Sequence, residues 1–335
     1  MLEDYYAIDR SELPVRKPGD LYYAKWGNII EPIDLNEAVE LDADQMGFVL
    51  IGFKCDKGVY INHGRAGALE GPEAIRNRLK RLPWHLGSRV RIFDAGDIEG
   101  VNRSLSDLQE SLSVAVERIV SLGLFPIVLG GGHETTFGHY MGHLKTLPTP
   151  LETIGALNID AHFDLREYDK TGPNSGTGFR QLYDLNQEKG LPFYYLVLGI
   201  QEHANQMHLF DYVAKHDTMR FLTGREIYTR GLPYVYQQVD RFIEKVDHVY
   251  LTIDMDCFSM GVAPGVSAIQ PIGLDPQGVV AILQYIASKN KLLGFDIVEV
   301  SPAYDVDYHT STLAATLIFY LTQVIYQTKQ KYKEI

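Results

Sequence analysis

The stretch IGALNIDAHFDLR, residues 154–166, joins a short apolar run to side chains that commonly bind metal ions. Asp160, His162 and Asp164 stand at every second position directly after the apolar residues. A strand that is apolar without interruption is typical of a parallel sheet covered on both faces. Because alternate residues of an extended chain point to the same side, we expect Asp160 and His162 to face the same way. The stretch therefore predicts a buried parallel strand that ends in a polar site.

Seven further short runs, β-branched or apolar, repeat this pattern along the chain. They cover residues 47–53, 89–96, 125–131, 193–200, 219–223, 249–256 and 292–300. Helical patterns lie between most of them, with Pro and Gly at the joins, at residues 71–82, 104–123, 232–246 and 276–289. Strands that alternate with helices indicate parallel βαβ units. We therefore predict an α/β fold, a three-layer αβα sandwich with a mainly parallel sheet of about eight strands.

The two ends of the chain differ from this pattern. Residues 1–45 are polar, rich in Pro and acidic residues, and without clear periodicity, so we interpret them as an N-terminal extension. Residues 46–335 are predicted to form a single domain. The apolar stretch at residues 313–326 is too short to span a bilayer and contains Thr and Gln, so it is predicted to be a docked final helix.

Charge and cysteine content narrow the class of protein. The net charge of −12 argues against a nucleic-acid surface, which needs clustered Lys and Arg. Two cysteines, Cys55 and Cys257, give neither a disulfide framework nor a zinc-finger spacing. The acidic start lacks the pattern of a signal peptide. We expect a cytoplasmic protein that binds neither nucleic acid nor membrane and acts on a small molecule.

Polar side chains also follow three other predicted strands. His133 and Glu134 come after residues 125–131, Asp254 and Asp256 close the run at 249–256, and Glu299 stands within the run at 292–300. Ligands of parallel sheets gather beyond the carboxyl ends of the strands. Five carboxylates stay charged in one low-dielectric pocket only if cations neutralise them. Four aspartates and two histidines, without a thiolate, predict a two-metal site and favour Mn²⁺.

Two other interpretations of these residues compete with metal binding. A single Asp-x-His-x-Asp pattern in a loop is often merely solvated, but here every polar group stands at the end of a predicted parallel strand. GGGHETT, residues 130–136, follows a strand and opens a helix as a dinucleotide loop does. The dinucleotide fingerprint, however, needs glycine at the position that Thr135 occupies. Metal binding is therefore the favoured interpretation.

Several motifs together resemble the ureohydrolase family of arginases, agmatinases and formimidoylglutamases, from about residue 47 to about residue 327. The motifs are GGGHE (130–134), NIDAHFDLR (158–166), SGTGF (175–179), TIDMDCF (252–258), APGVSA (263–268) and DIVEVSP (296–302). The resemblance implies a catalytic domain over residues 46–335, two Mn²⁺ ions per subunit and a homo-oligomer. It implies that a hydroxide bridging the two ions attacks the planar carbon of an amidine or guanidine.

The resemblance also assigns individual residues. It implies that His133, Asp160, Asp164 and Asp254 bind the first Mn²⁺, and that Asp160, His162, Asp254 and Asp256 bind the second. Asp256 and Glu299 are the implied catalytic residues. Glu299 would also hold the cationic nitrogen end of the substrate.

Within the family, the chain looks most like the formimidoylglutamase branch. This branch hydrolyses N-formimidoyl-L-glutamate to L-glutamate and formamide in histidine breakdown. The features it shares are Gly132 before the ligand histidine, the pair Gly138–His139, and residues 62–76, 164–166, 175–181 and 199–205. The substrate carries two carboxylates, for which arginine is well suited. We expect substrate contacts from Arg166, Ser175, Arg180, Gln201, Asn205 and Glu299.

Departures from the branch keep an alternative open. EVSP (299–302) is more typical of agmatinases, and Phe179 and Ser175 stand where other family members have histidines. The alternatives are a ureohydrolase that releases urea from a guanidine such as agmatine, guanidinobutyrate or arginine, or a non-catalytic metal-binding homologue. His139 is expected to pack beside the site, His203 and His309 to lie in loops near it, and Cys257 to be a small buried residue.

Overall fold

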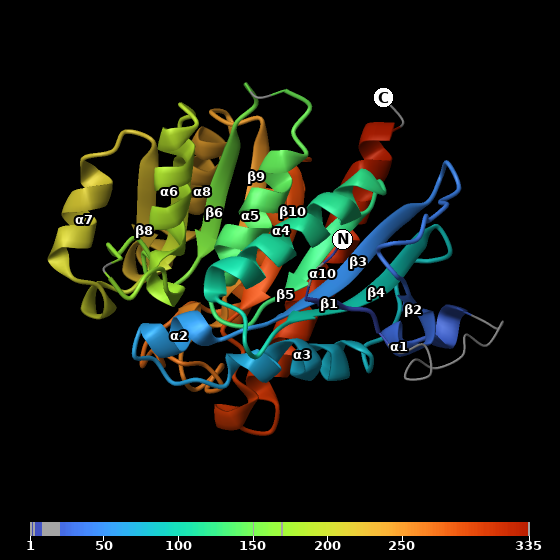
Figure 1. Cartoon of the computed structure of the whole chain (residues 1–335). Coiled ribbons are helices and arrows are strands. Elements are labelled where there is room, and N and C mark those ends of the chain that lie inside the picture. The colour runs from blue at the N-terminus through green and yellow to red at the C-terminus, as the bar shows by residue number, and fades with distance from the viewer. Residues whose placement is uncertain (1, 3, 9–20, 150, 169, 334–335) are drawn as a thin grey trace.

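The computed structural model describes residues 2, 4–8, 21–149, 151–168 and 170–333, and its centre is one twisted sheet. Along the described residues the sheet has ten strands in the order β1-β4-β3-β5-β10-β9-β6-β7-β8, with β2 beside β4 (Figure 1). The strands are β1 (Tyr5–Tyr6), β2 (Glu31–Pro32), β3 (Met46–Lys54), β4 (Val90–Glu99), β5 (Phe125–Leu129), β6 (Ile154–Ile159), β7 (Tyr194–Ile200), β8 (Met219–Thr223), β9 (His248–Asp254) and β10 (Leu292–Val298). All neighbours are parallel except β1 and β4.

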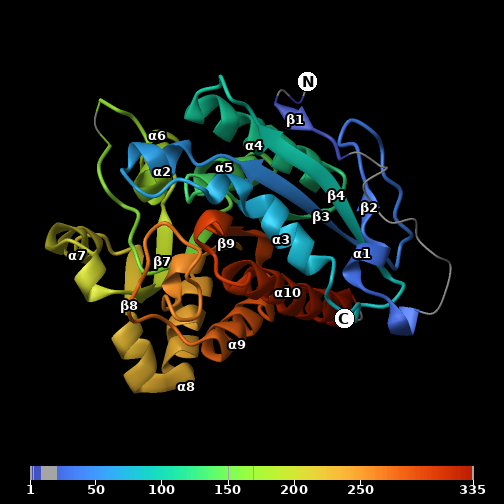
Figure 2. The same cartoon turned by 90° about the horizontal axis from the view of Figure 1, so that it is seen from below.

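Helices cover both faces of the sheet and complete three layers. Seen from below, α4, α5 and α6 lie on one side of the strands, and α3, α8, α9 and α10 lie on the other (Figure 2). The helices are α1 (Trp26–Ile29), α2 (Lys57–Ile61), α3 (Gly71–Leu79), α4 (Leu105–Ser121), α5 (Thr135–Lys145), α6 (Gly178–Glu188), α7 (Met207–Ala214), α8 (Gly224–Ile243), α9 (Pro276–Ala287) and α10 (His309–Lys333). The predicted α/β sandwich is thus confirmed.

The eight predicted strands correspond to β3 through β10, and the two short strands come from the N-terminal segment. The Tyr5 hydroxyl donates to the Ile33 carbonyl oxygen at 3.2 Å and accepts from the Leu35 N–H at 3.2 Å. Trp26 and Leu35 are fully buried. The described part of residues 1–45 therefore forms the edge of the sheet beside β4 and contributes to the core.

Side-chain caps set several helix starts. Ser104 and Asp107 form a reciprocal capping box at the start of α4. The carboxylate of Asp305 accepts from the N–H groups of Thr310 and Ser311 at the start of α10. In the described part of the chain, no helix is long and apolar enough to cross a bilayer.

Helix α8 begins at Gly224, whereas the sequence pattern predicts a start at residue 232. Thr223 caps the helix by accepting from the Glu226 N–H at 3.1 Å. Gly231, with φ 75° and ψ 174°, and Pro233 produce a kink inside the helix. The pattern of Gly231 and Pro233 resembles a helix start, because proline is favoured in the first turn.

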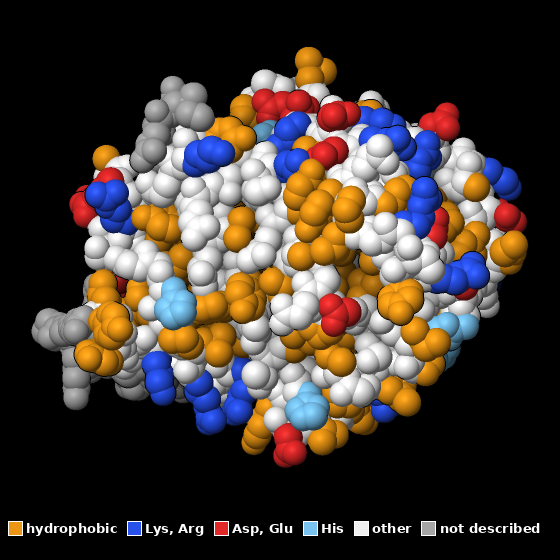
Figure 3. All heavy atoms as spheres, turned by 180° about the vertical axis from the view of Figure 1, so that it is seen from behind, with side chains coloured by type: hydrophobic (Ala, Val, Ile, Leu, Met, Phe, Trp, Pro, Cys, Tyr) orange, Lys and Arg blue, Asp and Glu red, His pale blue; other side chains and the backbone are white. Residues whose placement is uncertain are grey.

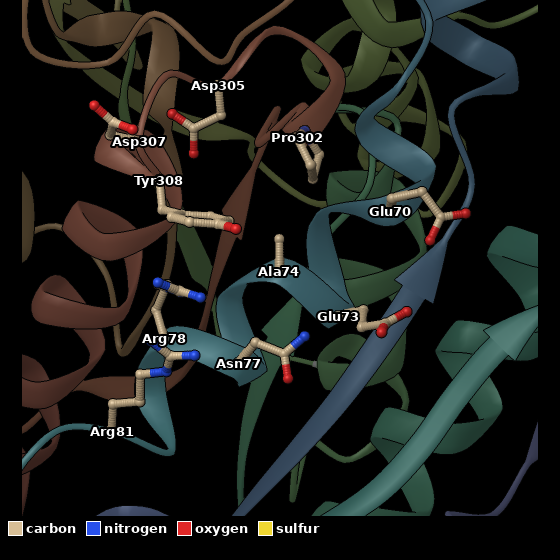
Figure 4. Close-up of a pocket in the computed structure, with 10 residues that line it drawn as sticks. All are labelled: Glu70, Glu73, Ala74, Asn77, Arg78, Arg81, Pro302, Asp305, Asp307 and Tyr308. Carbon is tan, nitrogen blue, oxygen red and sulfur yellow. The ribbon is translucent and has the colours of Figure 1, made fainter.

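Two of the larger cavities lined by the described residues lie away from the carboxyl ends of the strands. An apolar groove of about 860 Å³ runs between α8 and α9 and includes Ile227, Leu232 and Ile272. It belongs to the helical face on which hydrophobic side chains form several groups (Figure 3). A polar cavity of about 720 Å³ lies between α3 and the start of α10, where the Arg78 guanidinium packs on the Tyr308 ring at 3.8 Å (Figure 4). This stacking fastens α3 to the segment that leads into α10.

Candidate metal centre

Four neighbouring strands of the sheet, in the order β5-β10-β9-β6, bring the predicted ligands together. His133 follows β5, Asp160 directly follows β6, Asp254 ends β9 and Glu299 directly follows β10. Parallel strands end at the same edge, so polar groups far apart in the sequence meet there. The site is therefore a direct consequence of the strand order.

The first group of ligands surrounds one nitrogen of His133. Its Nδ1 lies 3.2 Å from Asp160 Oδ2, 2.9 Å from Asp164 Oδ2 and 3.1 Å from Asp254 Oδ2. Nδ1 of His133 is buried, and among the described residues it has no hydrogen-bond partner of acceptable geometry. Ligand atoms about 3 Å apart form the edges of an octahedron whose metal–ligand bonds are about 2.1 Å. The four atoms are thus arranged as they would be around a cation.

The second group shares Asp160 with the first. His162 Nδ1 lies 3.0 Å from Asp256 Oδ2 and 3.6 Å from Asp160 Oδ1. The two oxygens of Asp160 therefore face different groups, as in a bridging carboxylate. Asp254 is expected in both groups; its Oδ2 lies in the first group, and its Oδ1 accepts from the Asp256 N–H at 2.8 Å.

The electrostatics of the site call for added positive charge. Burial, with the Asp256 and Asp160 carboxylates adding to it, raises the pKa of Asp254 well above its usual value. Burial likewise raises the pKa of Asp256 to about 7. Burial lowers the pKa of His133, but the three aspartates around it raise that pKa well above the ordinary value. Without a cation, burial thus favours protons on Asp254 and Asp256, and divalent cations would neutralise the same carboxylates.

A buried relay fixes the ring of His133. Its Nε2 lies 3.1 Å from Thr252 Oγ1, and the Thr252 hydroxyl donates to Asp296. Because Thr252 gives its hydrogen to Asp296, its oxygen accepts from the His133 Nε2–H, which leaves Nδ1 as the electron-pair donor. His139 supports the same carboxylate with its Nδ1 2.7 Å from Asp296 Oδ2, in agreement with its expected place beside the site. Phe179 packs edge-on against the His133 ring.

Close backbone approaches explain the glycines before His133. A Cβ on Gly131 would lie 1.9 Å from the Cys55 carbonyl oxygen, and one on Gly132 would lie 2.1 Å from Glu134 Oε2. Glycine is thus required for packing around the ligand loop, and no phosphate site is needed to account for GGGHE.

A cavity of about 270 Å³ opens over the two groups, and we call it the strand-end cavity. It is lined by Asn62, His63, Gly64, Arg65, His162, Asp164, Arg166, Ser175, Asp254, Asp256, Ser267, Ala268 and Glu299. Three of these residues, His63, Asp164 and Glu299, have positive φ angles of 60°, 46° and 66°. Strained backbone of this kind concentrates at functional sites, because the surrounding structure must hold it in place.

Of the residues expected to contact substrate, the cavity brings together Arg166, Ser175 and Glu299. The Arg166 side chain is exposed and its Nη1 donates to Asn62 Oδ1 at 2.9 Å. Among the described residues, no carboxylate lies within ion-pair distance of Arg166. Its charge is therefore available to a ligand in the cavity.

The other three expected contacts do not line this cavity. Arg180 pairs with Asp184 at 3.2 Å. Gln201 donates to the Gly199 carbonyl oxygen at 3.2 Å. Asn205 holds the loop after β6, because it donates to the Ala161 carbonyl oxygen and accepts from the Phe163 N–H. In the structure, these three side chains contact other residues of the protein rather than the strand-end cavity.

The sequence patterns missed Asn62, His63, Arg65 and Ser267 as lining residues. They stand in loops rather than directly at strand ends, so the strand-end rule does not mark them. His203 and His309 lie outside the lining, and Cys257 is buried with a free thiol.

The fold and the two ligand groups define an α/β protein with a site for two divalent cations at the carboxyl edge of its sheet. The chain belongs to the arginase family, whose model matches residues 46–323. This membership confirms the resemblance of the sequence motifs.

Relatives and solved structures agree with this family. The chain is 56% identical over 324 residues to a formimidoylglutamase of Streptococcus gordonii, covering 97% of this chain and 98% of that relative. It is 55% identical over 327 residues to a formimidoylglutamase of Streptococcus pyogenes serotype M49, covering 98% and 99%. A crystal structure of formimidoylglutamase from Bacillus subtilis has a TM-score of 0.79 at 26% identity, covering 93% of this chain and 96% of that one. A structure of Trypanosoma cruzi formiminoglutamase with Mn²⁺ has a TM-score of 0.73 at 26% identity, covering 87% and 96%.

Proposed function

We propose that this chain hydrolyses the C–N bond of N-formimidoyl-L-glutamate and releases L-glutamate and formamide. The observation that carries the proposal is 55–56% identity to formimidoylglutamases over nearly the whole chain. The site supports it, because the ligand groups meet at one cavity with Arg166, which has no acidic partner among the described residues. The protein is accordingly a hydrolase of linear amidines.

The residues at the strand ends fit two Mn²⁺ ions. His133, Asp160, Asp164 and Asp254 would hold one, and Asp160, His162 and Asp256 would hold the other. Oxygen ligands with some imidazole and no thiolate suit Mn²⁺. Two bound divalent ions would supply a water activated for attack at neutral pH.

The remaining side chains would orient the substrate. Glu299 Oε1 accepts from the His133 N–H at 2.8 Å, while its Oε2 is buried without a hydrogen-bond partner among the described residues. That oxygen is suited to the cationic nitrogen end of an amidine, which donates charge-assisted hydrogen bonds. Arg166 would bind a carboxylate of the substrate. Asp256 Oδ1 is likewise buried with no hydrogen-bond partner in the described part of the chain, and it would accept a proton during hydrolysis.

An assay panel tests the proposal. Purified protein, incubated with Mn²⁺, is supplied in turn with formimidoylglutamate, agmatine, guanidinobutyrate and arginine, and both formamide and urea are measured. We expect formamide from formimidoylglutamate and at most traces of urea from the guanidines. Urea release from any guanidine, without formamide from formimidoylglutamate, would overturn the proposal in favour of a guanidine-hydrolysing ureohydrolase.

A further inference from the structure

We propose that Asn62 is a positioning residue that orients Arg166 without offsetting its charge by an ion pair, and so sets the selectivity of the site for a substrate carboxylate. This inference rests on the proposed function, in which Arg166 binds a carboxylate of formimidoylglutamate.

The two ends of the Asn62 amide contact two lining residues. Its Oδ1 accepts from Arg166 Nη1 at 2.9 Å, and its Nδ2 donates to Ser175 Oγ at 3.1 Å. The guanidinium offers only donors, so it must face the amide oxygen, and the NH₂ group is thereby directed at Ser175. The contacts fix the amide in one orientation.

Asn62 itself stands on a segment that is fastened to the ligand region. It directly follows α2, and its N–H donates to the Gly58 carbonyl oxygen at 2.9 Å. The Gly58 N–H donates to the buried Glu134 Oε1 at 2.7 Å, and Glu134 is the neighbour of His133. A Cβ on Gly58 would lie 2.6 Å from the Glu134 carboxyl carbon, so only glycine allows this approach. The short helix is thus anchored to the start of α5.

Arg166 is held from its backbone as well. Its N–H donates to the Gly176 carbonyl oxygen at 3.1 Å, next to Ser175. A Cβ on Gly176 would lie 3.2 Å from Asn62 Nδ2 and 3.4 Å from Arg166 Cδ, so the three residues pack closely. The guanidinium is therefore supported on one side and keeps its other N–H groups for a ligand.

The neutral charge of the Asn62 amide is the decisive property. A carboxylate at this position would also orient Arg166, but it would form an ion pair and compete with the carboxylate of the substrate. An amide orients the guanidinium without neutralising it. Among the described residues Arg166 has no acidic partner within ion-pair distance, which is what this role requires.

The test compares Asn62→Asp with the wild type on two substrates, formimidoylglutamate and the carboxylate-free amidine N-propylformamidine. We expect Asn62→Asp to raise KM for formimidoylglutamate about tenfold or more, the scale of one charge-assisted contact. Its KM for N-propylformamidine should stay within about twofold of the wild-type value, and its Mn²⁺ content should be unchanged. Asn62→Ala, which removes orientation but adds no charge, should raise KM for formimidoylglutamate by a smaller factor.

The control is Asn77→Asp, which adds the same charge on the exposed surface of α3, outside the strand-end cavity. It should match the wild type on both substrates. A KM for formimidoylglutamate within twofold of wild type in Asn62→Asp would overturn the inference. If that variant does not fold, an unchanged KM in Asn62→Ala has the same consequence. A wild type that releases no formamide from formimidoylglutamate overturns the proposed function instead, and this outcome is seen before any variant is compared.

Discussion

At the residue scale, Arg166 has surroundings unlike those of a typical surface arginine, which pairs with an acidic side chain. Its guanidinium lines the strand-end cavity and contacts an amide rather than a carboxylate. Arg180, fourteen positions later, pairs with Asp184 and contacts the Tyr212 ring at 5.3 Å. Arg166 and Arg180, which the sequence both offers as substrate contacts, thus have different surroundings, because the sequence alone does not show which partner each side chain meets.

Replacement of Arg166 by alanine should raise KM for formimidoylglutamate by about 10–100-fold, because a charge-assisted contact worth about 1.5–3 kcal/mol is lost. The Mn²⁺ content, measured by elemental analysis, should remain that of the wild type, since Arg166 is in neither ligand group. Arg225→Ala is the matched control, because Arg225 forms an exposed ion pair with Glu202. A KM unchanged in Arg166→Ala would show that the carboxylate is bound elsewhere.

The six proposed metal ligands and Glu299 were predictable because each stands in a strand-like run or within a few residues of its end, and strand order then brings them together. Asn62, His63, Arg65 and Ser267 were not predictable in this way. They reach the strand-end cavity because of the conformations of their loops, of which the positive φ of His63 is one example. These loop conformations depend on contacts with segments that are distant in the sequence. A local sequence pattern indicates where a strand ends, but it does not indicate how a loop is folded by contacts with distant segments.

At the scale of secondary-structure elements, the attachment of α3 to β4 depends on a buried charge cluster. Arg76 Nε donates to Asp94 Oδ2 at 2.9 Å, and its Nη1 donates to Asp97 Oδ1 at 2.6 Å. Asp94 is fully buried, and Arg76 is 6% exposed. Removing the guanidinium would leave a buried carboxylate without its counter-charge.

We therefore expect Arg76→Met to lower the free energy of unfolding by about 3–5 kcal/mol, measured by urea denaturation. Arg89→Ala removes an exposed pair with Asp44 and should change the same quantity by less than about 1 kcal/mol. A loss in Arg76→Met no larger than that in Arg89→Ala would mean that the buried cluster contributes little to stability.

The N-terminal segment should respond to alkaline pH through Tyr5. Burial, with Asp34 and Asp94 adding to it, raises the pKa of Tyr5 to about 12, although the Leu35 N–H lowers it. In the unfolded chain the phenol loses its proton near its ordinary pKa of about 10. Between these values the unfolded state binds fewer protons, so stability falls as pH rises from about 10 to about 12.

Tyr5→Phe should remove this part of the loss of stability at alkaline pH. The measurement is thermal denaturation of both proteins at pH values between 9 and 11.5. At pH 7 the substitution should cost about 1 kcal/mol, because two partly buried hydrogen bonds are lost. If the wild type and Tyr5→Phe lose the same amount of stability as the pH rises, groups other than Tyr5 cause the alkaline transition.

The elements themselves were predicted unevenly, for physical reasons. Most of strands β3 to β10 are largely apolar runs buried on both faces, and such runs are visible in the sequence. Strands β1 and β2 have two residues each, too few for any periodicity. Their pairing with β4 is decided by tertiary contacts such as those of Tyr5. The start of α8 was misplaced because Gly231 and Pro233, which usually end or begin helices, here bend one.

At the scale of the whole molecule, the fold concentrates acid at one edge of the sheet in a chain whose net charge is already −12. Asp160, Asp254 and Asp256 are almost fully buried, and so is Glu299. Placing these carboxylates together opposes folding unless protons or cations accompany them. The stability of the protein and the occupancy of its metal site should therefore be coupled.

Binding of a ligand to the folded state alone stabilises it by about 2.7 kcal/mol when the free ligand is at one hundred times its Kd. We expect saturating Mn²⁺ to raise the melting temperature measured by calorimetry, and EDTA to lower it, by several degrees for a chain of this size. Asp160→Asn separates this effect from a general influence of salt, because the Asp160 oxygens face both ligand groups. That variant should lose most of the response to Mn²⁺, whereas Mg²⁺ at equal ionic strength should not reproduce the wild-type shift. If the melting temperature of the wild type is the same with Mn²⁺ and with EDTA, protons alone neutralise the carboxylates at the strand ends. In that case the strand-end site does not bind the two metal ions on which the proposed hydrolysis depends.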